Sequence, residues 1–509
     1  MNKSFTSCLA LFCLTAAFLS CGGGRKGDNQ AVAGKADTAK VVKEVQPLPD
    51  TMYASAEVVK YHVDVYDSLP HPLKGLDGGA YATDDVLTFR KTLLRDADFG
   101  GRISGTPDSI AVEWKFETEY DKRKTKYGTW GGGSGWTGQP LYLAKTGEIV
   151  VGSLCGKVYF INFETGKASR SPLNAVNPIK GTISKDPELE NLYVGQGVPA
   201  EQPFGAMAFD LKKHSRGFFF GRDPKAKRGW NAFDSSPVVV GGYLFWPGEN
   251  GSLYKFERTQ GSLKLVSALR YTVNGAAPGV ENSLCVYRNY AYFGDNHGSV
   301  ICVNLETMKP VWRYDIGDDI DGSIVCHEEN GTPYLYVGCE VGRQGDSGVC
   351  RLAKLNGVDG SQVWRQELPC KRYRMGEKTL DGGIYCTPLL GRGDADGLVF
   401  LNICRHGGDG HSFISGQFVA FSTKDGHVVY ATQLNQFAWS SPVSFLNERG
   451  EDYVFTGDSG GHVYLIRAKT GDIIYKKRVA ANFESSPVVV GNAAVVGSRQ
   501  NGIYKFVIK

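Results

Sequence analysis

Short runs of alternating polar and apolar residues, separated by turns rich in glycine, asparagine and aspartate, recur along most of the chain. One unit recurs as VVGSLCGKVYFIN from residue 150, FWPGENGSLYKFE from 245, YFGDNHGSVICVN from 292, VFTGDSGGHVYLIR from 454 and VVGSRQNGIYKFV from 495. A second turn often follows this unit, as in FETGKAS and AKTGDIIY. A recurring segment such as FDSSPVVV or FESSPVVV often precedes the unit. Alternation of this kind predicts β-strands, so each repeat predicts four short strands.

The repeat length of about 45–55 residues is that of a propeller blade. Seven complete blades begin near residues 139, 181, 235, 282, 322, 382 and 440, and an eighth begins at Ser485 but has only three strands. The segment IAVEWKFE, 110–117, has the form of the fourth strands PVWRYD and QVWRQE, yet precedes the first blade. We therefore expect an all-β, eight-bladed β-propeller of four-stranded antiparallel blades, closed by pairing of the N- and C-terminal strands, which removes exposed sheet edges.

The N-terminus has the pattern of an export signal. Lys3, a short apolar stretch and small residues precede Cys21, and this stretch is too short to span a membrane. FLS-C followed by GGG resembles a bacterial lipobox, although Phe18 departs from the usual aliphatic residue; ordinary secretion is the alternative. We expect a signal peptide over 1–20, lipidation of Cys21, a flexible tether over 21–50, a pre-propeller extension over 51–105 and the propeller over 106–509.

Charge and cysteine content narrow the function classes. The formal net charge of +4 is small for 509 residues and gives no support to nucleic-acid binding. Nine cysteines remain after Cys21, most of them inside strand-like runs such as NSLCVY, where cysteine packs as a small buried hydrophobe. No C-x-x-C pair and no haem-attachment motif is present.

Carboxylates and aromatic residues recur in the loops just before the first strand of each blade. In blade order these positions hold Thr137, Lys180, Asp234, Glu281, Asp321, Asp381, Trp439 and Glu484. If the repeats superpose, these groups converge on one mouth of the axial channel, together with Trp130 and Trp136 of the glycine-rich loop GTWGGGSGWTGQP. Such a ring raises its own pKa values, holds a cation, or binds a sugar beside the tryptophans. The structural alternative is that the acid–Ser–Ser–Pro repeat only caps the strand starts.

Three local motifs are set aside on the repeat pattern. GDSGG, residues 457–461, resembles a serine-protease segment, but other blades have GENGS and GDNHGS in the same place, so Ser459 is predicted to be a hairpin residue. CRHGGDGHSF, residues 404–413, lacks a clear zinc spacing and is read as a surface loop. GDADG, residues 393–397, is too short for a calcium loop and is read as a turn.

The turn–tryptophan units LETMKPVW and LNGVDGSQVW, with the opening LTFRKTLLRDADFGG, resemble the pyrroloquinoline-quinone-like (PQQ-like) eight-bladed propellers. That family includes quinoprotein dehydrogenases and BamB, an outer-membrane lipoprotein that acts as a barrel-assembly scaffold. The resemblance implies a non-catalytic, lipid-anchored outer-membrane scaffold whose partner is a β-barrel assembly protein. The alternatives are glycan binding or polysaccharide processing at the aromatic and acidic mouth, and, less favoured, a quinone dehydrogenase using PQQ with Ca²⁺. The adjacent cysteine pair typical of the catalytic members is absent, and we assign no catalytic residue, no metal ligand and no cofactor.

Overall fold

The computed structural model describes residues 48, 58–136, 138–375, 378–405 and 415–509, all within the unit Val45–Lys509. Several predicted features lie outside the described residues: the signal peptide, Cys21, nearly all of the tether, Thr137, and His406 to His411 of the segment CRHGGDGHSF. Among the described residues, no helix is long and apolar enough to cross a membrane.

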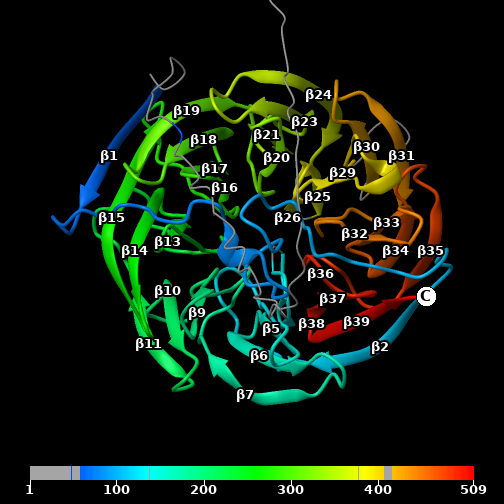
Figure 1. Ribbon diagram of the computed structural model, residues 1–509, viewed down its shortest axis with the longest axis horizontal. Coiled ribbons are helices and arrows are strands. Elements are labelled where there is room, and N and C mark those ends of the chain that lie inside the picture. The colour runs from blue at the N-terminus through cyan, green and yellow to red at the C-terminus, as the bar shows by residue number, and fades with distance from the viewer. Residues whose placement is uncertain (1–47, 49–57, 137, 376–377, 406–414) are drawn as a thin grey trace, which may run out of the picture. The chain divides into compact units, whose positions relative to one another are not determined.

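Eight antiparallel sheets surround one axis and confirm the predicted eight-bladed propeller (Figure 1). Blade 1 contains β4 (Leu141–Leu143), β5 (Glu148–Gly152), β6 (Lys157–Asn162) and β7 (Ala168–Asn174). Blade 2 contains β8 (Ser184–Lys185), β9 (Asn191–Gly195), β10 (Ala206–Asp210) and β11 (Ser215–Phe220). Blade 3 contains β12 (Val238–Val240), β13 (Tyr243–Gly248), β14 (Ser252–Thr259) and β15 (Ser262–Val273). Blade 4 contains β16 (Cys285–Tyr287), β17 (Tyr290–Gly294), β18 (Ser299–Asn304) and β19 (Lys309–Asp315).

The second half repeats the same order. Blade 5 contains β20 (Val325–Glu329), β21 (Thr332–Gly338), β23 (Ser347–Asn356) and β24 (Gln362–Lys371). Blade 6 contains β28 (Leu389–Leu390), β29 (Leu398–Cys404), β30 (Gly416–Ser422) and β31 (Val428–Leu434), and blade 7 contains β32 (Val443–Leu446), β33 (Asp452–Gly457), β34 (His462–Arg467) and β35 (Ile473–Arg478). Short elements lie between them: η2 (Gly79–Tyr81), η3 (Gly393–Ala395), and the pairs β3 (Gly132–Gly133) with β38 (Arg499–Gln500), β22 (Glu340–Val341) with β27 (Gly382–Gly383), and β25 (Tyr373–Met375) with β26 (Lys378–Leu380).

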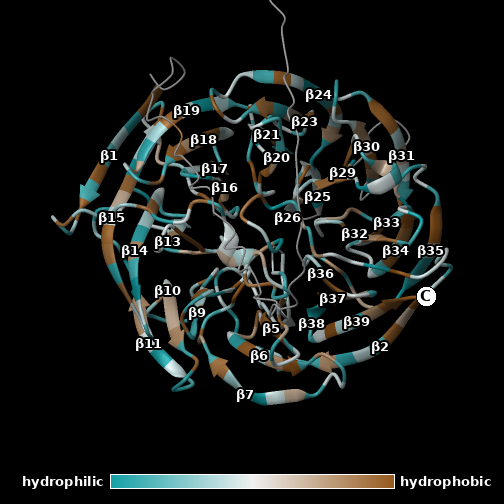
Figure 2. Ribbon diagram, in the orientation of Figure 1, coloured by the Kyte–Doolittle hydropathy of each residue, from teal (hydrophilic) through white to brown (hydrophobic). Residues whose placement is uncertain are grey.

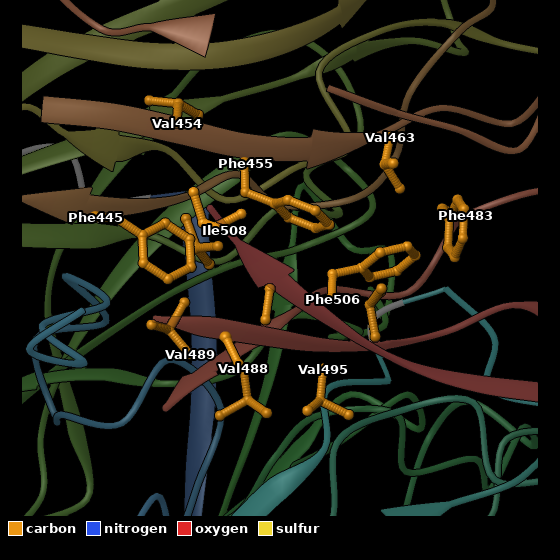
Figure 3. Packing of buried hydrophobic residues seen from close by; sticks show 14 of the residues in the cluster. Phe445, Val454, Phe455, Val463, Phe483, Val488, Val489, Val495, Phe506 and Ile508 are labelled. Carbon is orange, nitrogen blue, oxygen red and sulfur yellow. The ribbon is translucent and has the colours of Figure 1, made fainter. Parts of the chain in front are cut away.

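Blade 8 is closed by the two ends of the propeller, as predicted. Its order is β2 (Ile110–Glu117), β39 (Gly502–Ile508), β37 (Ala493–Gly497) and β36 (Val488–Val490), and Figure 1 shows β2 lying beside β39 at the C-terminus. Figure 3 shows Phe445 and Phe455 of blade 7 in the same apolar cluster as Val488, Val495 and Phe506 of blade 8. Hydrophobic and hydrophilic residues are mixed along the outer strands (Figure 2).

The repeated turn–tryptophan unit links successive blades. Trp114, Trp312 and Trp364 each donate their indole N–H to a carbonyl in the next blade, to Phe163 at 2.8 Å, Gly357 at 3.0 Å and Thr423 at 3.0 Å. A Cβ at Gly166, Gly360 or Gly426 would lie 2.5–2.6 Å from these rings. The turn glycine is therefore required both for its positive φ and for the close approach of the ring.

A belt of hydroxyl groups joins the first strands around the axis. The backbone N–H groups of Ser236, Ser283, Ser323, Thr387 and Ser441 each donate to the hydroxyl of the next blade, at Ser283, Ser323, Thr387, Ser441 and Ser486. Gln139 donates to Thr182, and a hydroxyl bond of 2.7 Å joins Ser184 to Ser236. The second hydroxyl residue of the acid–Ser–Ser–Pro repeat therefore has a structural role.

Residues 86–103 cross the axis and contact all eight blades (blue, at the centre of Figure 1). The buried Arg90 donates to the carbonyls of Arg95, Pro388 and Pro442, and the buried Arg95 donates to Leu284 and Phe89. The segment therefore closes the channel behind the acidic mouth.

Blade 3 has a fifth strand that the sequence did not predict. β1 (Val59–Val65) pairs antiparallel with β15 over seven residues and forms the outermost strand of that blade (Figure 1).

Candidate functional site

The acidic loop positions converge on one mouth of the channel, but they form two clusters rather than one even ring. Asp234, Glu249 and Glu281 offer oxygens within 4.8 Å of one another, and so do Asp319, Asp321 and Glu340. Asp381 instead forms an ion pair with Arg372, and Glu484 forms one with Arg499 at 3.2 Å.

Lys180 neutralises the first cluster. Its ammonium forms ion pairs with Asp234 and, at 3.6 Å, with Glu281, and both Asp234 and Glu249 are almost fully buried. Burial disfavours the charged lysine, but the carboxylates of Asp234, Glu281 and Glu249 outweigh it and raise the pKa of Lys180 well above its usual value. The ammonium thus supplies positive charge to two of the three carboxylates that could otherwise hold a metal ion.

The second cluster has no such cation among the residues that the structure describes. Burial raises the pKa of Asp319 to about 9, and the charge of Asp321 adds to the effect. Burial likewise raises the pKa of Glu340 well above its usual value. One oxygen of Asp319 and one of Glu340 are buried without a hydrogen-bond partner. Asp319 therefore holds its proton at neutral pH.

The tryptophans of the mouth cover these acids. Lys180 lies 5.6 Å from the ring of Trp136, and the guanidinium of Arg499 lies 5.4 Å from the ring of Trp130. Trp439 stacks on Tyr385 with ring centroids 5.1 Å apart. Trp130, Trp136 and Trp439 are all half-buried, so the glycine-rich loop forms part of a cap.

Comparison with known proteins shows which solved structures share this fold. A family model described as outer membrane protein assembly factor BamB matches residues 416–509. The fold is similar to that of quinohemoprotein alcohol dehydrogenase ADHIIG from Pseudomonas putida HK5, with a TM-score of 0.61, 13% identity and coverage of 87% of this chain and 83% of that one.

Two further solved structures share the fold. A europium-containing methanol dehydrogenase matches with a TM-score of 0.61, 12% identity and coverage of 84% of this chain and 99% of that one. BamB from Moraxella catarrhalis matches with a TM-score of 0.51, 14% identity and coverage of 79% and 100%. The chain thus shares the eight-bladed β-propeller fold of these proteins. No curated protein matches the chain.

The mouth of this propeller does not fit a quinone cofactor. The cavity between Phe89, Trp136, Glu281, Asp321, Tyr385 and Trp439 has a volume of about 10 Å³, which is room for about one water molecule. Sites for drug-sized ligands span roughly 300–1,000 Å³. PQQ is a tricyclic tricarboxylate, so this cavity is too small for it.

Two of the local motifs have structural roles in the propeller. Ser459 lies in the turn between β33 and β34, where its N–H donates to Phe437, as the repeat pattern predicted. Asp394 of GDADG lies in η3 and forms an ion pair with Arg467 at 2.7 Å. All nine cysteines after Cys21 are buried and unpaired, so none forms a disulfide in this structure.

Sequence reasoning missed several residues of the site. Glu249 directly follows Gly248 at the end of β13, and Glu340 follows β21 by two residues. A glycine ends the second strand in seven of the eight blades, while Cys404 ends it in blade 6, so the residues after that glycine were a usable signal. Lys180 was placed in the ring, but its pairing with the acids was not recognised.

Proposed function

We propose that this PQQ-like propeller is a non-catalytic binding scaffold of a bacterial envelope, anchored to the outer membrane through lipidated Cys21 and similar in role to BamB. The observation that carries the proposal is the filled channel mouth, where Trp136, Trp439 and the acids Glu281 and Asp321 are among the residues that line a cavity of only about 10 Å³. Neither a quinone nor a sugar ring has room there, which supports partner binding on the outer surface of the blades.

The match of residues 416–509 to the BamB family model supports the same proposal. The outer strands of the propeller present long, partly exposed faces, a geometry suited to protein partners. A β-barrel assembly protein is the partner that the likeness to BamB suggests.

The test is an affinity capture of the mature, lipidated protein from gently crosslinked envelopes. We expect a β-barrel assembly protein in near-equal amount, and we expect Cys21→Ser to lose the membrane fraction. Trp136→Ala serves as the matched control, because it alters the mouth and leaves the outer strands unchanged. Failure to recover any stoichiometric protein would count against the scaffold.

A titration with PQQ and Ca²⁺ tests the competing function. We expect no saturable change in tryptophan fluorescence and no dye-linked oxidation of alcohols. Saturable binding together with such oxidation would replace the scaffold proposal with a dehydrogenase.

A further inference from the structure

The outer edge of β1 differs from the outer edges of the other blades. In all eight blades the third and fourth strands pair with a register shift. Such bulges twist an edge strand and disfavour further pairing. β1 pairs with β15 through seven residues without any shift. It is therefore a regular edge strand on the outside of blade 3.

The register shows which backbone groups of β1 face outward. Tyr66 donates its N–H to Val266, and Asn274 donates its N–H to Val58. Because hydrogen-bonded and non-hydrogen-bonded pairs alternate in an antiparallel ladder, the even-numbered residues of β1 bond to β15. The N–H and C=O groups of Val59, Tyr61, Val63 and Val65 then point away from β15, and no described strand pairs with β1 on that side.

One face of the edge is apolar. Val59 is buried and Val63 packs against the same core cluster, while Tyr61 and Val65 on that face are 38% and 69% exposed. Leu69, just beyond the strand, is 67% exposed. Exposed apolar side chains concentrated beside a regular edge are a feature of binding surfaces.

The other face is cationic. Lys60, His62 and Asp64 line a cavity of about 380 Å³ together with Lys225, Lys227 and Arg270. Asp64 is already paired with Arg270 at 2.6 Å and with Lys225 at 3.0 Å. Lys60 and Lys227 form no ion pair with any residue that the structure describes. The face thus keeps an excess of positive charge, which favours an acidic partner.

We propose that the free edge of β1 binds an extended acidic segment of a partner protein, which adds to blade 3 as a sixth strand. Main-chain bonds to the outward groups of β1 supply affinity, and the side chains of alternate residues supply specificity. The bound strand carries acidic residues toward Lys60 and Lys227 and apolar residues toward Tyr61 and Val65. This inference rests on the proposed scaffold function and names the surface and the partner chemistry.

The test uses the purified full chain and a synthetic eight-residue peptide in which glutamate alternates with valine. Backbone amide hydrogen exchange is measured across β1 with and without the peptide. We expect exchange at Tyr61, Val63 and Val65 to slow at least tenfold on binding, whereas the amides that already bond to β15 change little. Absence of this protection at millimolar peptide would overturn the inference.

Variants separate the backbone and charge contributions. Tyr61→Pro removes one outward N–H and should abolish binding, and an unchanged unfolding temperature shows that the fold is kept.

The double variant Lys60→Glu with Lys227→Glu should weaken binding about tenfold. The matched control is Lys469→Glu, an exposed lysine in a turn of blade 7, which should bind as the parent does. Equal binding of a peptide with lysine in place of glutamate would overturn the acidic chemistry.

Envelope capture distinguishes this inference from the scaffold function. If the parent and the Tyr61→Pro variant recover the same partner in equal amount, the partner binds elsewhere and only the β1 inference fails. If neither the envelope nor the peptide yields a complex, both proposals fail.

Discussion

A single lysine determines the electrostatics of the channel mouth. Lys180 contacts Asp234 and Glu281, and its pKa is held well above the usual value by the surrounding carboxylates although burial opposes it. Removing one partner from a buried cluster of charges lowers the free energy of unfolding by more than the ion pair itself contributes, because the remaining charges stay buried without a partner.

The Lys180→Met substitution is therefore expected to lower the free energy of unfolding by about 3–5 kcal/mol at pH 8. The loss should shrink at pH 5, where Glu249 and Glu281, whose pKa values burial raises, take up protons. Urea denaturation at both pH values measures the effect. Lys213→Met, which removes only a pair at 4.0 Å between an exposed lysine and Asp210, is the control and should change stability by less than about 1 kcal/mol. An equal loss in both variants would contradict the assigned role.

The second cluster predicts a pH dependence of stability. Burial raises the pKa of Asp319 from 3.8 to about 9, so the native state holds a proton that the unfolded chain releases. The resulting stabilisation is complete below about pH 4 and is lost as the pH rises through 9. Asp319→Asn should flatten the decline in unfolding free energy measured by denaturation at pH 5, 7 and 9. Parallel slopes for the two proteins would show that Asp319 does not hold the proton.

Residue types at repeated positions could be predicted from the sequence, whereas distances between loops could not. Asp234, Glu281 and Asp321 occupy equivalent repeat positions, so their convergence followed from superposing the blades. Their division into two clusters depends on Lys180, Glu249 and Glu340. Those contacts are fixed by the backbone paths of separate loops, which no local pattern specifies.

At the level of the element, the turn between the third and fourth strands determines how neighbouring blades pack. Its glycine lies under the tryptophan of the preceding blade, as Gly360 does under Trp312. The turn–tryptophan spacing was readable in the sequence, but β1 was not predicted. VKYHVDV alternates like a strand, yet it matches no repeat, and its partner β15 is more than 200 residues away, as the Val59↔Val273 pair shows.

Gly360→Ala should destabilise the protein more than Gly331→Ala. Both glycines have positive φ, +73° and +83°, but a Cβ at Gly360 lies 2.6 Å from the Trp312 ring while one at Gly331 has no neighbour within 4 Å. We expect about 1–2 kcal/mol from the backbone in both variants and a further 1–3 kcal/mol or so from overpacking at Gly360 alone. Guanidinium unfolding midpoints measure the difference, and equal midpoints would argue against close docking of the ring.

At the scale of the whole molecule, the propeller depends on the pairing of β2 with β39. Trp114 of β2 also packs on Gly166 of blade 1 and donates to Phe163. One strand therefore links the last blade to the first.

Trp114→Ala should lower the free energy of unfolding of the entire propeller by about 3–5 kcal/mol in one cooperative transition. Val112→Ala in the same strand removes a side chain that is 43% exposed and should cost no more than about 0.5 kcal/mol. Calorimetry of both variants measures the change. A separate low-temperature transition in Trp114→Ala would indicate that blade 8 unfolds on its own.

The closure of blade 8 has a consequence for the order in which the protein is made. β2 leaves the ribosome before any blade is complete, yet its partner β39 is among the last residues synthesised. Gly502 follows Glu117 by 385 residues, so at about 5–20 residues per second β2 waits roughly 20 to 80 s with an unpaired edge. A chain that terminates before Gly502 never buries that edge, and this provides a feature by which quality control can tell a truncated product from a finished one.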